Sequence, residues 1–334
     1  MASRYYICNH VENGYNAGSK AVNDVNSILQ RCGFQPLYFG FKIGCNKMIK
    51  LLSGIRQLLN ILFTIRLHDL VFIQYPIYIN KPLKELLYRI LLCKRTKIIL
   101  LVHDLPTYRG DINDDQEEFI LFKSDVVICH TPNMKEYLLE KGVIEDRIRI
   151  LYLFDYLTNE VNLYQSTYSN KIIYAGNLVK SEFVPQLAEL DKLQFLLYGL
   201  PEVEFKDDSK VKYMGKFSPS DISGIIGDWG LVWDGPSLLS CEGRFGEYLR
   251  INSPHKVSLY IASEKPVIIW ENSSLKDFIV NNHLGISVKS LTDIDDRINA
   301  LSNLEIANMQ KAIKKYSIML RHGEILEGVI NSIV

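Results

Sequence analysis

The setting of Lys256 indicates a binding function more clearly than any other short pattern in this sequence. Lys256 follows Pro254 and His255, and residues with helical periodicity continue to Ala262. A proline fits the first turn of a helix without losing a hydrogen bond, whereas the helix dipole disfavours a cation there. A diphosphate bound between the Lys256 ammonium and the helix N-terminus would remove this conflict. We therefore predict that Pro254, His255 and Lys256 form the start of a phosphate-binding helix.

Glycines and polar residues follow other predicted strands in the second half of the chain. Gly176, Asn177 and Lys180 come after one strand-like run. Asp234 follows another, and Asn252 precedes the helix just described. Glycine allows the backbone to approach a ligand closely, and lysine can contact a phosphate as a point charge. We predict that these residues share one site with the helix, although Lys180 could also be an ordinary exposed lysine.

A glycine-containing loop near the N-terminus leads into another predicted helix. Gly14 and Gly18 permit close backbone approach. Ser19 and Lys20 open the helix, whose first N–H groups attract anions. The spacing is too short for a Walker A loop, and the Ser-Lys order is reversed. Gly18, Ser19 and Lys20 are candidate ligand-binding residues, but a tight turn with a helix cap explains the pattern equally well.

An imidazole and a carboxylate follow the buried strand predicted over Lys97–Val102. His103 and Asp104 would project from the carboxyl end of that strand, where open parallel sheets place their ligand sites. Either group could remove a proton from an attacking hydroxyl. Asp104 is the first candidate for a catalytic base and His103 the second. Asp104 could instead cap the segment that follows.

Alternating strands and helices are predicted to position these residues. The strands cover 5–8, 37–39, 69–74, 97–102, 125–129, 171–174, 194–198, 231–233 and 266–270, and the helices cover 19–31, 47–66, 84–93, 255–262, 275–281 and, as one or two helices, 304–334. Continuous apolar strands between helices indicate parallel sheets covered on both faces. The fold class is therefore α/β, with two Rossmann-like domains whose parallel sheets face across a cleft.

The balance of charge and the cysteine pattern exclude several classes of protein. The 334 residues include 38 basic and 38 acidic residues, so no overall field attracts a polyanion such as nucleic acid. Six scattered cysteines without a C-x-x-C pair form neither a zinc knuckle nor a dense disulfide framework. The residues before the predicted first strand show neither a secretory h-region nor a cleavage site. We expect a cytoplasmic protein with reduced thiols.

Basic residues are concentrated between residues 41 and 100. This stretch carries eleven lysines and arginines but only two acidic residues. Polar residues interrupt its most apolar part, 48–67, which falls short of the ~20 apolar residues that a spanning helix needs. A basic helix with an apolar face can lie on an anionic membrane surface. Its leucines could instead pack into the core or into a contact between subunits of a homo-oligomer.

Together, these motifs resemble glycosyltransferases of the GT-B fold. The motifs are Asn16-Ala-Gly-Ser-Lys-Ala21, Phe154-Asp-Tyr156, Tyr174-Ala-Gly-Asn-Leu178, Trp233-Asp-Gly235, Asn252-x-Pro-His-Lys256 and Lys265-Pro-Val-Ile268. They are similar to those of bacterial β-1,6-galactofuranosyltransferases of O-antigen and surface-polysaccharide assembly. More distantly, they resemble the glucosyltransferases that extend GlcNAc on serine-rich adhesins.

This resemblance implies a domain organisation and a set of contacts. It implies an acceptor-binding domain at 1–155, a linker at 156–170, a nucleotide-sugar-binding domain at 171–310 and C-terminal helices at 311–334 that pack back on the first domain. By resemblance to the adhesin glucosyltransferases, Tyr213 and Asn177 would contact the nucleotide or donor. Lys20 with Gly18 would close the site from the other domain.

The resemblance also implies the reaction. An acceptor hydroxyl on a lipid-linked glycan would attack the anomeric carbon of a UDP-sugar, for which UDP-galactofuranose is the first candidate. Leu259 stands where many retaining members carry a glutamate, which favours inversion. No metal or cofactor is expected beyond the UDP-sugar substrate, and Asp293-Ile-Asp295 is interpreted as a helix cap rather than a metal site.

Other functions stay open at this stage. The donor could be UDP-glucose and the acceptor a GlcNAc-modified protein or another glycan. An epimerase of the same architecture would convert a UDP-sugar without an acceptor. A non-catalytic nucleotide-binding partner of another transferase would keep the fold without the reaction. RNA binding through the basic stretch is disfavoured because no recognition module or aromatic RNA-binding motif is present.

Overall fold

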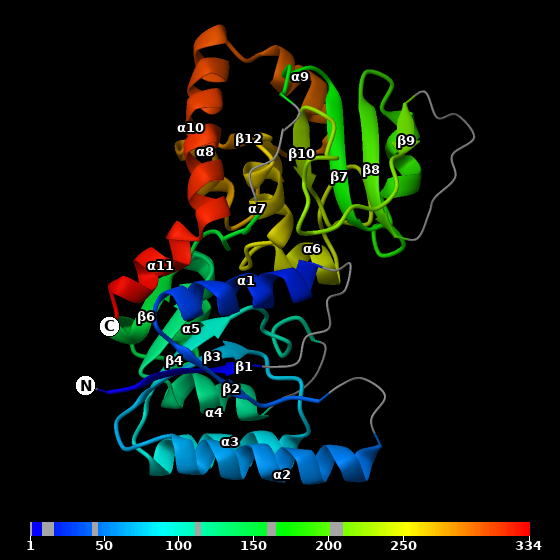
Figure 1. Ribbon diagram of the computed structural model, residues 1–334. Helices are drawn as coiled ribbons and strands as arrows, with labels where there is room; N and C mark the ends of the chain where they lie inside the picture. The colour runs from blue at the N-terminus through cyan, green and yellow to red at the C-terminus, as the bar shows by residue number, and fades with distance from the viewer. Residues whose placement is uncertain (1, 9–16, 42–45, 111–114, 159–164, 201–209) are drawn as a thin grey trace. The chain divides into compact units, whose positions relative to one another are not determined.

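Two parallel sheets form the centre of the structure, as the apolar strands predicted. Each sheet has six strands, and every pair of neighbouring strands runs in parallel. The α/β fold class with two Rossmann-like sheets is confirmed. The computed structural model describes residues 2–8, 17–41, 46–110, 115–158, 165–200 and 210–334 (Figure 1).

The chain divides into two compact units. The first unit contains residues 1–14, 22–151 and 326–334, and the second contains 15–21 and 152–325. The last residues of the chain therefore belong to the same unit as the first ones. The first helix begins in the second unit and continues in the first.

The first sheet has the strand order β2-β1-β3-β4-β5-β6. Its strands are β1 (Arg4–Cys8), β2 (Gln35–Tyr38), β3 (Leu70–Tyr75), β4 (Lys97–Val102), β5 (Val126–Cys129) and β6 (Ile148–Ile150). The helices along this part of the chain are α1 (Ala17–Arg31), α2 (Lys47–Thr64), α3 (Lys81–Cys93), α4 (Asp115–Lys123), α5 (Pro132–Glu140), the 3-10 helix η1 (Glu145–Arg147) and the terminal α11 (Glu324–Asn331).

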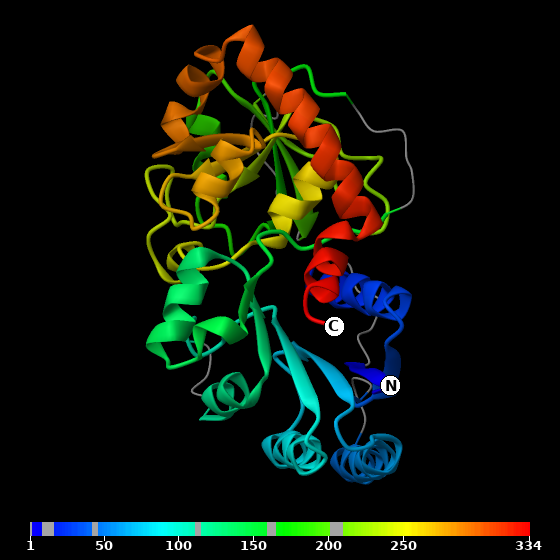
Figure 2. The same cartoon turned by 90° about the vertical axis from the view of Figure 1, so that its left-hand side faces the viewer.

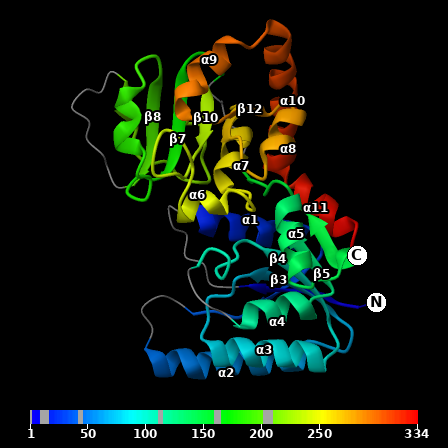
Figure 3. The same ribbon diagram turned by 180° about the vertical axis from the view of Figure 1, so that it is seen from behind.

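Helices cover both faces of this sheet. Figures 1 and 3 show α2, α3 and α4 on one side of the strands, and α1 and α5 on the other. All six residues of β3 and all four of β5 are buried, because apolar side chains on both faces meet a layer of helices. Polar side chains at the strand ends are therefore the ones available for chemistry.

The second sheet has the strand order β12-β11-β10-β7-β8-β9. Its strands are β7 (Lys171–Asn177), β8 (Gln194–Leu200), β9 (Val211–Tyr213), β10 (Trp229–Val232), β11 (Val267–Trp270) and β12 (Gly285–Val288). Its helices are η2 (Val184–Glu189), α6 (Arg244–Tyr248), α7 (His255–Ala262), α8 (Lys276–Asn281), η3 (Leu291–Asp293), α9 (Ile294–Asn299) and α10 (Asn303–His322).

Helix α7 packs directly against the backbone of the central strand β10. A Cβ atom at Gly230 would lie 2.0 Å from Cγ of Tyr260, so only glycine leaves room for this aromatic ring. Helix α10 lies along the outside of α7 (Figure 2), and Ser317 Oγ donates a hydrogen bond of 2.9 Å to the Ala262 carbonyl. The position of α7 in this unit is therefore fixed from both sides.

The sequence predicts the long elements better than the short ones. Strand β4 and helix α7 have the predicted bounds, and the predicted C-terminal helical stretch is two helices, α10 and α11. The three- and four-residue strands β6, β9 and β12 were not predicted, because such short runs show no distinctive periodicity. Helix α2 ends at Thr64 rather than Arg66, because Ile65 adopts an extended conformation.

Replacing Gly230 with alanine is expected to destabilise the second unit. The new methyl group would overlap the Tyr260 ring, and overpacking of this kind costs about 1–3 kcal/mol. Urea unfolding followed by tryptophan fluorescence measures the loss. The control is Gly224→Ala, because no heavy atom lies within 4 Å of a Cβ built there. Equal unfolding midpoints for the two variants would contradict the close contact.

Candidate functional site

The strand order of the second sheet reverses between its two central strands. From β7 the chain moves outward through β8 to β9, and from β10 it moves the other way through β11 to β12. Open parallel sheets bind ligands outside the carboxyl ends of the strands at such a switch point. Gly176 and Asn177 end β7, Asp234 follows β10 by two residues, and Lys256 lies in the first turn of α7.

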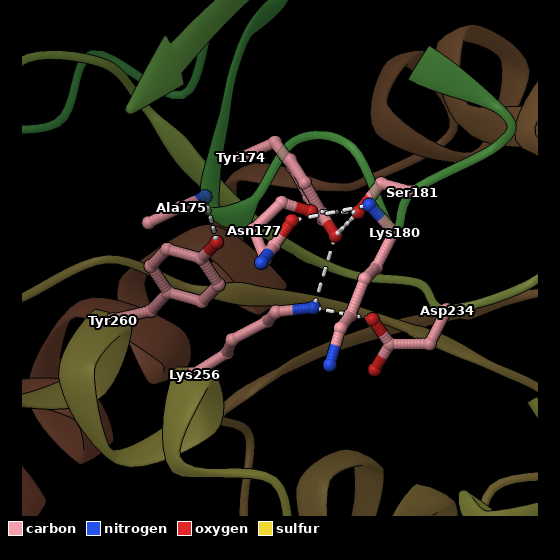
Figure 4. Close-up of polar contacts among 8 residues, drawn as sticks. All are labelled: Tyr174, Ala175, Asn177, Lys180, Ser181, Asp234, Lys256 and Tyr260. Atoms are coloured by element: carbon pink, nitrogen blue, oxygen red, sulfur yellow. Dashed lines mark hydrogen bonds and ion pairs between the residues drawn. The ribbon is translucent and has the colours of Figure 1, made fainter. Parts of the chain in front are cut away.

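Lys256 is held between a carboxylate and a phenol. Its Nζ donates to Oδ1 of Asp234 at 2.5 Å and to the hydroxyl of Tyr174 at 3.1 Å, and it lies 4.7 Å from the centroid of the Tyr174 ring (Figure 4). The Lys256 side chain is 18% exposed and that of Asp234 is 28% exposed. Burial acts to lower the pKa of Lys256, but the Asp234 carboxylate and the Tyr174 phenol raise it overall. The ammonium therefore stays charged throughout the physiological pH range.

A chain of hydroxyl groups continues from Lys256 to the backbone of β7. Tyr174 OH lies 2.5 Å from Ser181 Oγ, which donates at 2.8 Å to the Asn177 carbonyl. Because Ser181 donates its proton to that carbonyl, it accepts one from Tyr174, which in turn accepts from Lys256. The direction of every hydrogen bond in the chain is thus determined by the cation at its end.

Two further features determine the surroundings of the Lys256 side chain. The backbone N–H of Ala175 donates to the Tyr260 hydroxyl at 2.9 Å, which ties β7 to α7 (Figure 4). A Cβ at Gly176 would lie 3.1 Å from Cε and 3.6 Å from Nζ of Lys256. A larger residue at this position would press on the lysine side chain, so glycine is what allows the extended conformation of Lys256.

The other predicted residues in and after β7 and in β9 make contacts of their own. Oδ1 of Asn177 accepts hydrogen bonds of 3.1 Å from the N–H groups of Val179 and Lys180, and so closes the loop after β7. Lys180 is exposed, with its Nζ 5.7 Å from the centroid of the Phe245 ring. The Tyr213 hydroxyl donates at 2.9 Å to the carbonyl of Gly199 at the carboxyl end of β8.

The segment before α7 presents a histidine and a buried amide oxygen. Pro254 is the N-cap residue of α7, and the His255 ring stacks on Phe154 with 5.0 Å between ring centroids. Oδ1 of Asn252 is buried and has no hydrogen-bond partner among the described residues. A buried carbonyl oxygen of this kind is a ready acceptor for a hydroxyl or N–H group of a ligand.

The predicted residues near the N-terminus lie in helix α1. Residues 9–16, which precede them, are outside the described part of the chain, and so is the burial of Gly18. Ser19 and Lys20 are buried in the first turns of α1. Lys20 Nζ donates at 2.5 Å to the Leu157 carbonyl and lies 4.8 Å from the centroid of the Tyr156 ring.

The two candidate bases lie at the carboxyl end of β4 in the first unit. Oδ1 of Asp104 is 3.2 Å from Nη1 of Arg109, and both side chains are about one quarter to one third exposed, at 32% and 24%. Nε2 of His103 lies 2.8 Å from Oε1 of Gln74. Asp104 therefore has a cationic partner, whereas His103 has a neutral one.

Several of these contacts involve residues that sequence patterns did not single out as functional. Tyr174 and Tyr260 belong to apolar runs, in which a tyrosine is expected to be a core residue. Ser181 and Arg109 lie in loops, and only their contacts with Tyr174 and Asp104 show that they belong to these groups.

Asp293 accepts a hydrogen bond from the Ser290 N–H as part of a capping box. No group of three or more metal-ligating side chains occurs in the part of the chain that the structure describes.

Comparison with known proteins identifies the family. A model of the glucosyltransferase 3-like N-terminal domain matches residues 4–153, and one of the C-terminal domain matches residues 172–333. The chain belongs to the glucosyltransferase 3-like family. It is thus a glycosyltransferase, and the resemblance inferred from its motifs is confirmed.

Two relatives and one solved structure illustrate the range of this family and fold. The chain is 33% identical over 243 residues to beta-1,6-galactofuranosyltransferase WbbI of Escherichia coli K12, covering 71% of each protein. It is 27% identical over 315 residues to glucosyltransferase 3 of Streptococcus gordonii, covering 93% of this chain and 92% of that protein. The structure of Anabaena HepE with UDP and glucose matches with a TM-score of 0.60 at 10% identity over 99% of both chains. This last match shows the GT-B fold.

A second histidine supports the strand that carries His103 in this glycosyltransferase. His130 follows β5, is 1% exposed, and its Nε2 lies 2.7 Å from the carbonyl of Val102. A carbonyl can only accept, so Nε2 carries a proton. Burial lowers the pKa of His130 from 6.5 to about 4, although the Val102 carbonyl acts in the opposite direction. His130 is therefore neutral at pH 7.

The buried neutral His130 predicts a loss of stability in acid. In the unfolded chain the imidazole binds a proton below pH 6.5, but in the folded protein it does so only below about pH 4. Its contribution to stability is thus fully present above pH 6.5 and is lost as the pH falls toward 4. Between about pH 7.5 and about pH 5 the expected loss is about 2 kcal/mol.

Urea unfolding of wild type and His130→Gln at both pH values measures this term. We expect the glutamine variant to lose about 2 kcal/mol less than wild type over the same pH interval. The control is His322→Gln, which removes an exposed histidine and should behave as wild type does. Identical pH dependence for wild type and His130→Gln would refute the assignment.

Proposed function

We propose that the protein is an inverting glycosyltransferase that transfers galactofuranose from UDP-galactofuranose to a hydroxyl group of a glycan acceptor in bacterial surface-polysaccharide synthesis. The observation that carries this proposal is the fixed Lys256 ammonium at the switch point of the second sheet. The 33% identity to a galactofuranosyltransferase supports the choice of sugar. The HepE structure, solved with UDP and glucose, supports a uridine diphosphate donor.

The charge that develops on the leaving diphosphate explains the need for Lys256. As the bond between sugar and diphosphate breaks, negative charge accumulates on the phosphate oxygens. A preorganised cation and the N–H groups at the start of α7 stabilise that charge without any reorganisation in the transition state. Lys180 adds a second, exposed cation next to the same loop. In this proposal the two lysines and the helix start take the place that a metal ion has in other transferases.

The ion pair with Asp234 adds a constraint on how the donor binds. Lys256 donates to a carboxylate in the structure, and a diphosphate would compete for the same ammonium. The lysine has three N–H donors, so it can contact a phosphate oxygen while it keeps one partner. Asp234, Asn252 and Tyr213 then provide acceptors and a hydroxyl for the sugar and nucleotide hydroxyl groups.

Inversion requires an enzyme base that removes the proton of the acceptor hydroxyl. It does not require a carboxylate on α7. Leu259, one helical turn after Lys256, is 7% exposed and belongs to the core of the second unit. A leucine can neither donate nor accept a proton. We therefore assign the base to His103 or Asp104, at the carboxyl end of β4.

Glucosyl transfer from UDP-glucose is the second candidate function. The relative named glucosyltransferase 3 matches 93% of this chain, a larger share than the 71% matched by the galactofuranosyltransferase. The two donors differ in the ring size of the sugar and in the positions of its hydroxyl groups, but both carry a uridine diphosphate. The same lysine and helix start would therefore serve either one.

A donor screen separates these candidates. We expect the purified protein to transfer a hexose from UDP-galactofuranose to a synthetic glucosyl or GlcNAc acceptor, as measured by mass spectrometry, and to transfer little from UDP-glucose. Replacing Lys256 with methionine should lower the transfer rate ~10- to 100-fold, because a charged hydrogen bond contributes roughly 1.5–3 kcal/mol. The control, Lys276→Met, removes an exposed lysine paired with Asp277 and should leave transfer unchanged.

Four outcomes would contradict the proposal in different ways. Preferred transfer from UDP-glucose would establish the second candidate. Conversion of the UDP-sugar without an acceptor would indicate an epimerase. Binding of UDP without transfer from any donor would indicate a non-catalytic partner of another transferase. Unchanged transfer by Lys256→Met would refute the role of the lysine.

We further propose that helix α2 binds an anionic membrane surface that carries a lipid-linked acceptor. In the first unit, Leu58 packs into the core, but most other apolar residues of this helix are exposed. The exposed ones are Met48, Ile49, Leu51, Leu52, Ile55, Leu59 and Phe63. Lys50 and Arg56 lie on the same helix, which has no acidic residue. An apolar face flanked by cations matches an anionic lipid surface.

This membrane proposal concerns binding at the surface. Of the helices in the described residues, none is long and apolar enough to span a bilayer. We expect the protein to co-sediment with vesicles that contain phosphatidylglycerol but not with vesicles of phosphatidylcholine alone, and to dissociate at high salt. The double variant Leu52→Ser with Phe63→Ser should bind several-fold less, whereas Leu304→Ser, which changes an exposed leucine of α10, should bind normally.

Absence of binding at low salt would refute the membrane proposal. If light scattering then showed a dimer for wild type and a monomer for the double variant, the apolar face of α2 would be a contact between two copies of the chain.

A further inference from the structure

Two loops flank the switch point of the second sheet, and one contact joins a side chain from each of them. The loop after β7 carries Lys180, and the loop after β10 leads into α6, whose second residue is Phe245. Nζ of Lys180 lies 5.7 Å from the centroid of the Phe245 ring. A cation within about 6 Å of a ring centroid is attracted by the electrons of the ring face. Phe245 thus links the two loops, although no sequence pattern singled it out.

Hydrogen bonds fix the backbone from which the Lys180 side chain extends. Oδ1 of Asn177 accepts from the backbone N–H of Lys180 at 3.1 Å. The next residue, Ser181, is 5% exposed and donates from Oγ to the Asn177 carbonyl at 2.8 Å. The backbone around Lys180 is therefore held, while its own side chain is exposed. Figure 4 shows this side chain running from the loop toward Asp234 and the end of Lys256.

The loop after β10 is packed closely against itself where it leads to Phe245. A Cβ at Gly235 would lie 2.2 Å from the carbonyl oxygen of Ser240. A Cβ at Gly246, the residue after Phe245, would lie 1.5 Å from the carbonyl oxygen of Cys241. Only glycine permits such close approach of one backbone segment to another. The backbone of Phe245 therefore has little freedom, even though its side chain is 42% exposed.

A second contact ties the same two loops together. Gln186 belongs to η2, which follows the loop after β7, and its Nε2 donates at 3.0 Å to the carbonyl of Pro236 in the loop after β10. The two loops are therefore joined at two places, by this hydrogen bond and by the contact of Lys180 with Phe245. All four residues belong to the second unit.

An aromatic ring is a suitable partner for a lysine that binds an anion. Lys256 is paired with Asp234, and that carboxylate competes with a phosphate for the ammonium. The Phe245 ring carries no net charge, so it restrains Lys180 without neutralising it. A lysine side chain also loses conformational entropy when a ligand orders it. A lysine that is already held loses less, so its ligand binds more tightly.

We propose that Phe245 is a positioning residue, whose ring holds the Lys180 ammonium where it contacts the diphosphate of a nucleotide donor. This inference rests on the proposed function and adds a residue that acts through Lys180 rather than on the donor itself. The cation comes from the loop after β7, and its restraint comes from the loop after β10. Binding of the diphosphate therefore depends on both loops of the switch point.

Calorimetric titration with UDP tests this role without any sugar transfer. Phe245→Leu keeps an apolar side chain but removes the ring, so we expect UDP to bind about two- to fivefold more weakly. Phe245→Tyr keeps the ring and should bind UDP as wild type does. The matched control is Phe119→Leu, which makes the same change at a phenylalanine that is 38% exposed in the first unit. This control should also bind UDP as wild type does.

A double-mutant cycle determines whether the ring acts through the lysine. Lys180→Met alone should weaken UDP binding roughly tenfold, because it removes a charged hydrogen bond to the diphosphate. If the ring only positions the ammonium, Phe245→Leu should cause no further loss when it is added to Lys180→Met. The loss from Phe245→Leu is thus expected in the wild-type background and not in the Lys180→Met background.

Two results would overturn the positioning role while leaving the proposed function in place. One is UDP binding by Phe245→Leu that equals binding by Phe119→Leu. The other is an equal loss in both backgrounds, which would indicate that the ring contacts the nucleotide directly, supports the loop, or acts through Arg244, whose Cζ lies 5.7 Å from the ring centroid. If wild type binds no UDP, the proposed function and this inference fail together.

Discussion

The reversal of strand order in each parallel sheet is the constraint on which the rest of the structure depends. Parallel strands end at a common edge, and the two directions of the chain leave a gap at the point where they diverge. In the second sheet this point lies between β7 and β10, and in the first between β1 and β3. The candidate site residues lie at these strand ends, because the central strands such as β3 and β5 are buried along their whole length.

The two switch points use different means to fix a functional side chain. At the second, a buried ammonium is neutralised by one carboxylate and sets the direction of a series of hydroxyl hydrogen bonds. At the first, the side chains of His103, Gln74, Asn26 and Cys8 form a series of contacts. In the proposed reaction, a cation that is already in place needs no reorganisation when a diphosphate arrives.

Short-range patterns predict the parts of this structure that short-range physics determines. The apolar run Lys97–Val102 and the proline-initiated helix His255–Ala262 were placed correctly. The phosphate-binding role inferred from the conflict between Lys256 and the helix dipole stays a prediction. Contacts between distant residues had no such signal. Tyr174 and Lys256 are 82 residues apart in the sequence, and Asn26 and Gln74 are 48 apart, so only the fold brings them together. A glutamine in an apolar strand gives no hint that its amide faces a histidine.

The space around Gly176 limits how this enzyme can evolve. A single added carbon there would approach the lysine side chain to 3.1 Å, and the same lysine is bound on its other sides by Asp234 and Tyr174. Any larger residue at position 176 therefore requires the Lys256 side chain to shift between its two partners. Variation among descendants is easier to accommodate in the loops that follow β7 and β10, which can change in length and sequence without disturbing these contacts.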